Sequence, residues 1–479
     1  MKRSWLAACW MVLTSVGCGG GFESLEPGGA PPASGVGATP GGAQDMAYAR
    51  RLISEGQIPQ PDAFVLEGLY SEHDLPLDGP ACEQVLCLST ATGIATALDT
   101  NRQEVFVQVG FSSNVNAATF HRTPLDVALV IDHSDSMTGE PMAAVKDAAR
   151  RLVEKLDERD TFSLVMFDNS SEVLVAQRPV SDRAALLRAI DRIEADGSTC
   201  IECGLKDGYA QLSKVPHDTQ RSRRVFLFTD AMPNVGTTHP NDFLTLVRTH
   251  SEQGQDLTFF GVNLTFDQQF VTQLSAVRGA NSFYLSDPER IRSVFDEDFD
   301  YLVTPIAYDL KMALTPAEGF RVEAVYGLPG VSPGAAQADM KVATVFLSRR
   351  KGALLARLSR TEPVTPGQSL LRGALTFQST GGAESSSLLT ASYSGGEPLA
   401  TTEAWYSQET VRKTVALTNF VLGAKGASDK WYAGDKAGAR ALADRTAELL
   451  EHEAERLGDE PLRGEAKVAR QLAALMIVP

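Results

Sequence analysis

An alternation of short apolar segments and amphipathic segments between residues 123 and 304 constrains the fold more than any other feature of this chain. The apolar segments are rich in Val, Leu and Phe, as is typical of strands that are buried on both faces. In chain order they are VALVID (127–132), FSLVMF (162–167), EVLVAQ (172–177), VFLFTD (225–230), LTFFGV (257–262) and SFYLS (282–286). We predict that each forms a strand of one sheet.

Helical stretches separate most of these strands. In the first stretch, apolar residues recur at the spacing of one helix face, at Met142, Val145, Ala149, Leu152 and Leu156. Buried strands that alternate with amphipathic helices predict a doubly wound α/β domain with a mostly parallel sheet. The short turn DNSS between the second and third strands predicts a hairpin, and therefore one antiparallel edge strand.

The segments that flank this domain, which we place at 123–304, have other patterns. Residues 46–122 contain an alternating stretch, QEVFVQVGFSS, and predict a small N-terminal β-containing extension. Residues 305–402 consist of short alternating segments between turns, which predicts a β-sandwich. Residues 403–479 are rich in Ala, Leu, Glu and Arg, and predict a helical C-terminal segment.

The N-terminus has the features of an export signal. Lys2 and Arg3 precede an apolar stretch that is too short to span a bilayer and that ends in SVGC at Cys18. This ending resembles the processing site of bacterial lipoproteins, which implies a signal peptide over residues 1–18 and a lipid on Cys18. A plain secretory signal with a chance cysteine is the alternative. Residues 19–45 are rich in Gly and Pro, and are expected to be a flexible linker.

A lipid anchor would hold the protein on a membrane of the cell envelope. Gly19 rather than Asp follows the cysteine, which resembles the sorting pattern of outer-membrane lipoproteins. We therefore expect an outer-membrane lipoprotein, periplasmic or surface-exposed. The net charge of −16 argues against nucleic acid as a partner, and against membrane binding through a basic patch.

The remaining cysteines outside the signal are Cys82, Cys87, Cys200 and Cys203. Export implies an oxidising compartment, so disulfides are expected, and of the possible pairings we favour the two local ones. A zinc site built from CEQVLC and CIEC is an alternative, as is a redox-active Cys-x-x-Cys at a helix N-terminus.

Oxygen-bearing side chains follow two of the predicted strands and precede one predicted helix. Asp132 ends the first strand, with Ser134 and Ser136 at alternate positions after it. Asp230 ends VFLFTD, and Thr199 lies just before a helix. The carboxyl ends of parallel strands lie at the edge where open α/β sheets bind ligands, so we expect these residues to meet there.

Two carboxylates and three hydroxyls suit a hard divalent cation, Mg²⁺ or else Mn²⁺ or Ca²⁺. The carboxylates balance the charge, while the neutral hydroxyls leave the cation able to accept a carboxylate from a partner. Turn chemistry alone also explains Asp-x-Ser-x-Ser after a strand. The positions of Thr199 and Asp230 in neighbouring loops favour the cation site.

The segments LVIDHSDSM, GST and FTD, at these spacings, resemble the metal-ion-dependent adhesion site of a von Willebrand factor type A (VWA) domain. The resemblance covers about residues 124–303, including AMPNVG (231–236) and FFGVNLTFDQQFVTQLSAV (259–277). It implies a Rossmann-like fold that binds protein ligands through Mg²⁺. Ser134, Ser136 and Thr199 would then contact the metal most directly, and Asp132 and Asp230 directly or through water.

Three further expectations concern the neighbours of this site. His133 and Asp135 lie between the proposed ligands and are expected to face outward. Cys200 and Cys203 are not part of the family pattern, and a bridge between them would stiffen the loop that carries Thr199. YARRLISEGQIPQPDAF (48–64) resembles, more loosely, the extension before the A domain in a group of bacterial exported proteins.

These features favour a binding function without enzymatic turnover. The leading hypothesis is a lipid-anchored VWA protein that holds an unknown protein partner by an acidic residue of that partner, for adhesion or assembly. A regulatory subunit of an envelope transporter or channel is the alternative. A metal-assisted hydrolase is less favoured, because the sequence offers no clear general base and no histidine cluster.

Overall fold

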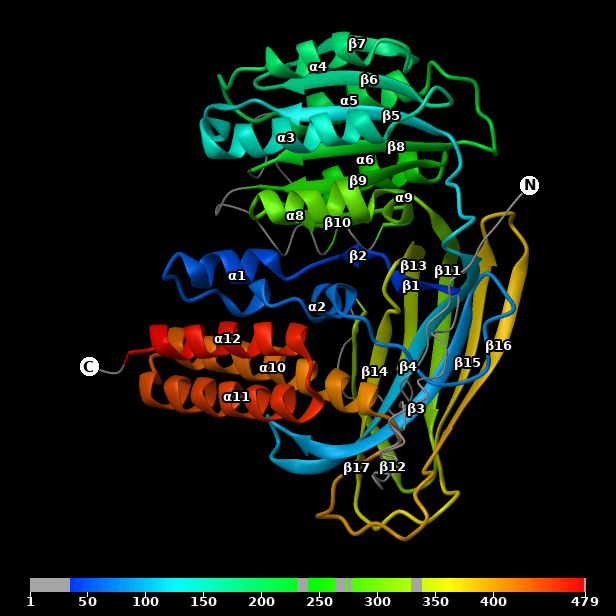
Figure 1. The fold of residues 1–479 in the computed structure, drawn as a ribbon, viewed down its shortest axis with the longest axis vertical. Helices are drawn as coiled ribbons and strands as arrows, with labels where there is room; N and C mark the ends of the chain where they lie inside the picture. The colour runs from blue at the N-terminus through cyan, green and yellow to red at the C-terminus, as the bar shows by residue number, and fades with distance from the viewer. Residues whose placement is uncertain (1–34, 231–239, 263–272, 274–276, 329–337, 478–479) are drawn as a thin grey trace, which may run out of the picture.

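The computed structural model describes residues 35–230, 240–262, 273, 277–328 and 338–477. They form three packed parts, which Figure 1 shows as an α/β domain at the top, a large β-sheet at the lower right and a helical part at the lower left. The predicted signal peptide, Cys18 and the predicted linker as far as residue 34 lie outside the described residues, as do residues 231–236 and most of the second segment of the family resemblance.

A seven-stranded sheet forms the α/β domain, in the order β2-β10-β9-β8-β5-β6-β7. Its strands are β2 (Gly42–Ala43), β5 (Leu125–Asp132), β6 (Thr161–Phe167), β7 (Ser171–Pro179), β8 (Ser222–Thr229), β9 (Gln255–Gly261) and β10 (Asn281–Tyr284). Neighbours pair in parallel except for β6 and β7, which are antiparallel. The predicted doubly wound α/β fold is thus confirmed, with its antiparallel edge strand.

Helices cover both faces of this sheet. Along β5, Val127, Leu129 and Ile131 belong to one apolar core, whereas Ala128 and Val130 belong to the other. The first core is closed by α3 (Glu140–Lys155), α4 (Arg183–Asp191), α8 (Pro288–Arg292), η3 (Ser293–Glu297) and α9 (Phe299–Leu302). The second is closed by α5 (Ile201–Leu212) and α6 (Pro240–Ser251). The continuous apolar runs of the strands follow from burial on both sides.

The second sheet has ten strands, and it unites segments that the sequence analysis assigns to separate domains. They are β1 (Gly35–Pro40), β3 (Cys87–Ala97), β4 (Arg102–Asn116), β11 (Pro305–Pro316), β12 (Phe320–Tyr326), β13 (Ala338–Ser348), β14 (Ala353–Arg360), β15 (Ser369–Ser379), β16 (Glu384–Ser392) and β17 (Trp405–Tyr406). Because β4 pairs with β14, the extension 46–122 and the segment 305–402 share one sheet and are not two domains.

This sheet curls until its distant strands meet. The side-chain hydroxyls of Thr90 and Thr92 in β3 donate to the carbonyl oxygens of Thr390 and Ser392 in β16, at 2.7 and 3.4 Å. The enclosed face holds an apolar core that draws on residues between 36 and 111 and between 306 and 393. The predicted sandwich therefore takes the form of one folded sheet.

Residues 35–40 and 42–43 form strands, and the prediction of a flexible linker up to residue 45 is wrong over this part. β1 lies between β4 and β13 and pairs with both in antiparallel orientation. One residue later the chain enters the other sheet, where β2 pairs with β10. A side chain at Gly37 would place its Cβ 2.0 Å from the carbonyl oxygen of Arg350, so the glycine serves close packing rather than flexibility.

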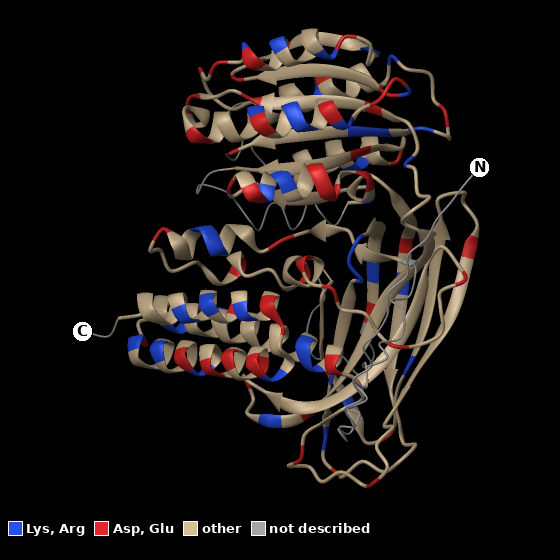
Figure 2. Cartoon of the chain, viewed as in Figure 1, with Lys and Arg blue, Asp and Glu red and all other residues tan. Residues whose placement is uncertain are grey.

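The helical part consists of a C-terminal bundle and the helices that follow β2. Its elements are α1 (Ala47–Ser54), η1 (Pro61–Ala63), α2 (Leu66–Glu72), α10 (Glu409–Tyr432), α11 (Lys436–Leu457) and α12 (Glu460–Leu475). They share one apolar core. Gly458, with a φ of 61°, ends α11, and the carboxylate of Asp459 caps α12. Figure 2 shows acidic and basic residues interspersed along these helices.

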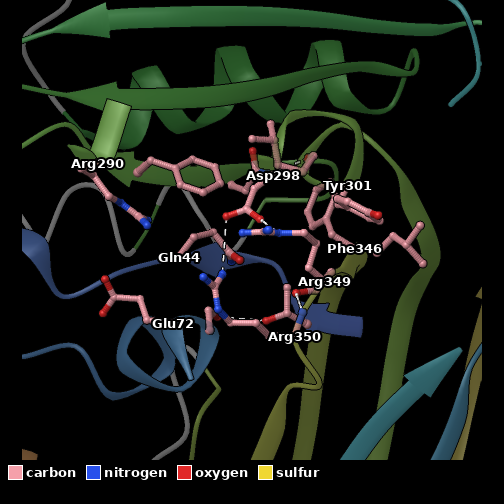
Figure 3. Close-up of a pocket in the computed structure, with 15 residues that line it drawn as sticks. Gln44, Glu72, Arg290, Asp298, Tyr301, Phe346, Arg349 and Arg350 are labelled. Atoms are coloured by element: carbon pink, nitrogen blue, oxygen red, sulfur yellow. Dashed lines mark hydrogen bonds and ion pairs between the residues drawn. The ribbon is translucent and has the colours of Figure 1, made fainter. Parts of the chain in front are cut away.

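The three parts meet at a polar junction (Figure 3). Arg349 and Arg350, which follow β13, point toward Asp298 of the α/β domain, with N–O distances of 2.6 and 3.5 Å. The cavity that these side chains help to line measures about 40 Å³, a space for water and not for a larger ligand. Among the described residues, no helix has the length and apolarity needed to cross a membrane.

Candidate metal centre

The predicted site residues lie at the carboxyl edge of the seven-stranded sheet. Asp132 is the last residue of β5, and Asp230 directly follows the neighbouring strand β8. Ser134 and Ser136 lie in the Asp132 loop, defined here as residues 132–139. Thr199 lies in the Thr199 loop, residues 194–200, which leads into α5. The topology that brings these loops together is the one expected of parallel neighbours in an open sheet.

A chain of hydrogen bonds links four of the five residues. The side chain of Asp132 accepts from the backbone N–H of Ser134 at 2.9 Å. The hydroxyls of Ser134 and Ser136 lie 3.2 Å apart, and the Ser136 hydroxyl donates to Asp230 Oδ1 at 2.9 Å. Ser136 is exposed, while the other three are buried, so the cluster reaches solvent at one side chain.

Asp132 is a buried carboxylate in an environment that opposes its charge. Loss of hydration raises its pKa from 3.8 to about 6, although hydrogen bonds from Thr229 and Ser134 act in the opposite direction. The nearby carboxylate of Asp230 adds to the increase. Two buried acidic groups beside each other cost free energy unless a positive charge compensates them. The electrostatics of the cluster therefore suit a bound cation.

The Thr199 loop is fastened to the Asp132 loop along its length. The backbone N–H of Asp196 donates to the carbonyl oxygen of His133 at 2.6 Å, and that of Asp135 donates to the carbonyl oxygen of Gly197 at 2.9 Å. The Asp135 carboxylate in turn accepts from the Gly197 N–H. Thr199 itself is buried beside these contacts. The structure thus brings the fifth predicted residue into the same loop system.

His133 does not face outward as predicted. Its side chain is buried, and Nδ1 lies 3.0 Å from the carbonyl oxygen of Glu194. The Thr199 loop covers it, which is a contact between residues far apart in sequence. Asp135 is exposed as predicted, but its carboxylate bonds the Thr199 loop, so it helps to position that loop.

The turn between β6 and β7 supports the Thr199 loop from the other side, and sequence reasoning did not single it out. The carbonyl oxygen of Asp168 accepts from the N–H of Cys200 at 2.7 Å, and Asn169 Oδ1 accepts from the N–H of Ser198 at 3.2 Å. Asp168 and Asn169 belong to the segment DNSS, whose residue types are common in turns and do not by themselves indicate a functional site. Thr229, whose hydroxyl donates to Asp132, was also missed, although it precedes Asp230.

A disulfide joins Cys200 and Cys203 in the first turn of α5, directly after Thr199. The second disulfide joins Cys82 and Cys87 at the start of β3. Both are local pairs. Helix α5 packs closely on the sheet, because a Cβ at Gly204 would lie 2.4 Å from the ring of Phe167. The start of α5, and with it Thr199, is therefore held by a covalent bridge and by packing.

The donor set fits a hard divalent cation better than a soft one. Two carboxylates and three hydroxyls offer only oxygen, which Mg²⁺ and Ca²⁺ prefer. A metal site can also be built from His, Cys, Asp and Glu side chains alone. Within the described ranges, no three or more of these side chains form a group that could hold a metal ion. A cation here would depend on the hydroxyls, and would keep positions for water or for a ligand.

The comparisons with known proteins agree with this geometry. The family described as the von Willebrand factor type A domain matches residues 126–297. The α/β domain is therefore a VWA domain. The match does not include the ten-stranded sheet or the C-terminal helices.

Two bacterial relatives are uncharacterized proteins. One, from Synechocystis sp., is 32% identical over 179 residues, which are 37% of this chain and 41% of the relative. The other, YfbK of Escherichia coli, is 24% identical over 274 residues, which are 55% of this chain and 47% of the relative. The chain thus matches less than half of the length of each.

Among solved structures, the chain is similar to a von Willebrand factor type A protein from Catenulispora acidiphila. The identity is 15%, the TM-score is 0.49, and the likeness covers 81% of this chain and 91% of the other.

Proposed function

We propose that this chain is a binding protein of the cell envelope, anchored by a lipid on Cys18, whose VWA domain holds a protein partner through a divalent cation. Mg²⁺ is the cation we favour. It would be held by Asp132, Ser134, Ser136, Thr199 and Asp230, and it would accept a carboxylate that the partner presents. VWA domains often mediate interactions between proteins, which agrees with this role in adhesion or assembly.

One observation carries the proposal: at the carboxyl edge of the sheet, the hydroxyl of the exposed residue Ser136 lies between the hydroxyl of Ser134 and the buried carboxylate of Asp230. A cation in contact with that hydroxyl would be buried on the protein side and open on the solvent side. A partner carboxylate would complete its coordination without entering the domain. The bound cation would also compensate the charges of Asp132 and Asp230.

The proposal includes no turnover. His133, the histidine next to Asp132 in the chain, is buried, and its Nδ1 lies 3.0 Å from the carbonyl oxygen of Glu194, so its ring is used to hold the Thr199 loop. The hydroxyls and carboxylates of the cluster would be occupied by the cation. A binding role uses every feature described above, whereas a hydrolase would need a general base in addition.

Calorimetric titration of Mg²⁺ and Mn²⁺ tests the cation site. The protein should begin at Gly19, so that it keeps β1, which lies between β4 and β13 in the second sheet. We expect saturable binding that Asp132→Asn abolishes. Glu158→Gln is the matched control, since Glu158 is an exposed acid that lies just before β6, at the opposite edge of the sheet. If neither the native protein nor Asp132→Asn binds the metal at millimolar concentration, the cation site is refuted.

Membrane fractionation tests the anchor separately. Full-length protein should sediment with membranes and Cys18→Ser should be released in soluble form, because a lipid chain contributes the attachment. Mass spectrometry of the N-terminal peptide should find the acyl groups on Cys18. Release of both proteins into the soluble fraction would remove the anchor from the proposal and leave the cation site untouched.

A further inference from the structure

A second surface lies on the same edge of the VWA domain, and it is a groove of about 480 Å³. Four segments line it: the end of α1, the first two turns of α3, Val262 directly after β9, and the segment from the end of β10 into α8. Its apolar floor includes Leu285 and Ile291, which are buried, and its walls include Pro141 and Ala144. The volume is within the range of pockets that hold small ligands or a few side chains.

The rim of this groove is acidic. Glu55, Glu140, Asp147 and Asp287 line it against one basic residue, Arg51. The side chain of Glu140 is 80% exposed and that of Glu55 is 42% exposed. Asp287 already caps α8, and Asp147 pairs with Arg151. Glu55 and Glu140, which are exposed and whose basic neighbour in the groove is Arg51, favour a positively charged occupant.

Arg51 gives the strongest indication of what the groove accepts. Its guanidinium lies 2.8 Å from Glu55, directly after α1, and 3.7 Å from Glu140 on α3, so it reaches across the groove from one wall to the other. The protein thereby places a cation of its own between the two carboxylates. Exposed ion pairs of this kind contribute little stability, so a basic side chain from a ligand can replace Arg51 at small cost.

The wall that α1 supplies is fixed in place. Strand β2 pairs with β10, and Tyr48 of α1 packs edge-on against Tyr284 with ring centroids 5.2 Å apart. Helix α1 lies outside residues 126–297, so the VWA domain alone would have only part of the groove. Figure 1 shows α1 beside the lower edge of the α/β domain, close to α8. The groove is therefore a feature of this chain's N-terminal segment as well as of its VWA domain.

The groove and the cation cluster are within reach of one extended peptide. Helix α3 begins a few residues after Ser136, and the strands β9 and β10 that end at the groove are the second and third neighbours of β5. At about 4.8 Å per strand this is roughly 10–15 Å, or about three to five residues of extended chain.

We propose that this groove binds a basic segment of the partner protein, a Lys or Arg flanked by apolar residues, beside the carboxylate that the cation holds. The inference rests on the proposed function, because it names the second half of the surface that the same partner would occupy. The basic side chain would displace Arg51 and lie between Glu55 and Glu140, while its apolar neighbours would cover the floor.

The test is a selection from a random peptide library displayed on phage, against the immobilised chain from Gly19 onward in EDTA. EDTA removes divalent cations, so peptide binding to the groove is measured without a contribution from the cation cluster, and its outcome does not depend on the proposed cation site. We expect the enriched peptides to carry Lys or Arg next to apolar residues. No enrichment, or enrichment of peptides without basic residues, would overturn the proposal.

Variants then locate the binding. The affinity of the enriched peptides should fall about tenfold in Glu140→Lys and in Glu55→Lys, and should rise in Arg51→Ala, which removes the competing cation. Glu158→Lys, the same charge reversal at the opposite edge, should leave it unchanged. Circular dichroism of each variant controls for folding. Equal affinities for Glu140→Lys, Arg51→Ala and the native protein would refute the groove as the binding site.

Discussion

At the scale of single residues, Asp132 combines two roles that conflict in the absence of a cation. It organises the loop by accepting from Ser134 and Thr229, and yet its burial raises its pKa to about 6. Since the folded-state pKa exceeds the unfolded value, the native protein binds more protons than the unfolded chain between about pH 4 and pH 6. Stability attributable to this residue is therefore complete below about pH 4, and is lost as the pH rises through about 6.

Replacement by asparagine removes this conflict. Without cation near pH 7, Asp132→Asn should be more stable than the native protein by up to about 3 kcal/mol, the equivalent of the pKa shift. In millimolar Mg²⁺ the order should reverse, because only the native protein gains the free energy of cation binding. Urea unfolding of both proteins, in EDTA and in Mg²⁺ and at about pH 4 and pH 7, measures these free energies of unfolding. A variant that is less stable in EDTA near pH 7 would contradict the argument.

The same residues show how far the sequence predicts a site of this kind. The alternation of Asp132, Ser134 and Ser136 after an apolar strand, with Asp230 at the end of a second, suffices to predict that they converge. The position of His133 could not be predicted, because it is set by the carbonyl oxygen of Glu194, in a loop 61 residues away along the chain. Successive side chains face opposite sides in an extended strand, and this rule no longer holds where the chain turns.

At the scale of secondary-structure elements, the start of α5 is held in place beside the cation cluster, directly after Thr199. Its position depends on the Cys200–Cys203 disulfide, on the N–H bond from Cys200 to Asp168, and on the packing of Gly204 against Phe167. The other disulfide, between Cys82 and Cys87, lies at the start of β3 in the other sheet. The chain thus offers two local bridges, one next to the cluster and one in another part of the molecule.

Removal of the first bridge should weaken cation binding. The double variant Cys200→Ser/Cys203→Ser allows the Thr199 loop more conformations, which must be given up again when the cation binds, so we expect the Kd for Mg²⁺ to rise by a factor of about 3 to 10. Cys82→Ser/Cys87→Ser is the matched control, with an unchanged Kd. Calorimetry of both variants decides the matter. An equal change in the two would assign the effect to general loss of stability.

Strand β1 illustrates why some elements cannot be predicted from the sequence. The segment GVGATP has the composition of a linker, and nothing within it indicates a strand. Its partners, Ser348 and Ser112 for Gly37 alone, lie far along the chain, and its glycine is required by the backbone at Arg350. The inner strands of the VWA domain, β5, β8 and β9, are different, because they are buried on both faces and each therefore contains a continuous apolar run.

At the scale of the whole molecule, the segment that follows β1 couples the two sheets. Only Gly41 separates β1 from β2, so neighbouring strands of one chain belong to different sheets. Asp45 then accepts from the N–H of Tyr284 at 3.0 Å and pairs with Arg290 at 2.8 Å. Both partners of that ion pair are largely buried, with exposed fractions of 4% and 14%. The VWA domain is thereby fastened to the part of the chain that precedes it.

Loss of the Asp45–Arg290 ion pair should make the two sheets unfold in separate transitions. Asp45→Ala leaves the buried charge of Arg290 without this partner, at a cost of about 3–5 kcal/mol. We expect one calorimetric transition for the native protein and two for the variant, the first of them from the VWA domain. Asp62→Ala, which removes an exposed carboxylate in the same segment, should keep one transition.

Mg²⁺ then identifies which transition belongs to which part. In the native protein, cation binding should raise the temperature of the single transition, because a ligand stabilises the whole cooperative unit to which its site belongs. In Asp45→Ala it should raise only the first transition and leave the second where it was. If Mg²⁺ shifted both transitions of the variant equally, the sheets would still be coupled by contacts other than Asp45, and the coupling role of this residue would be refuted.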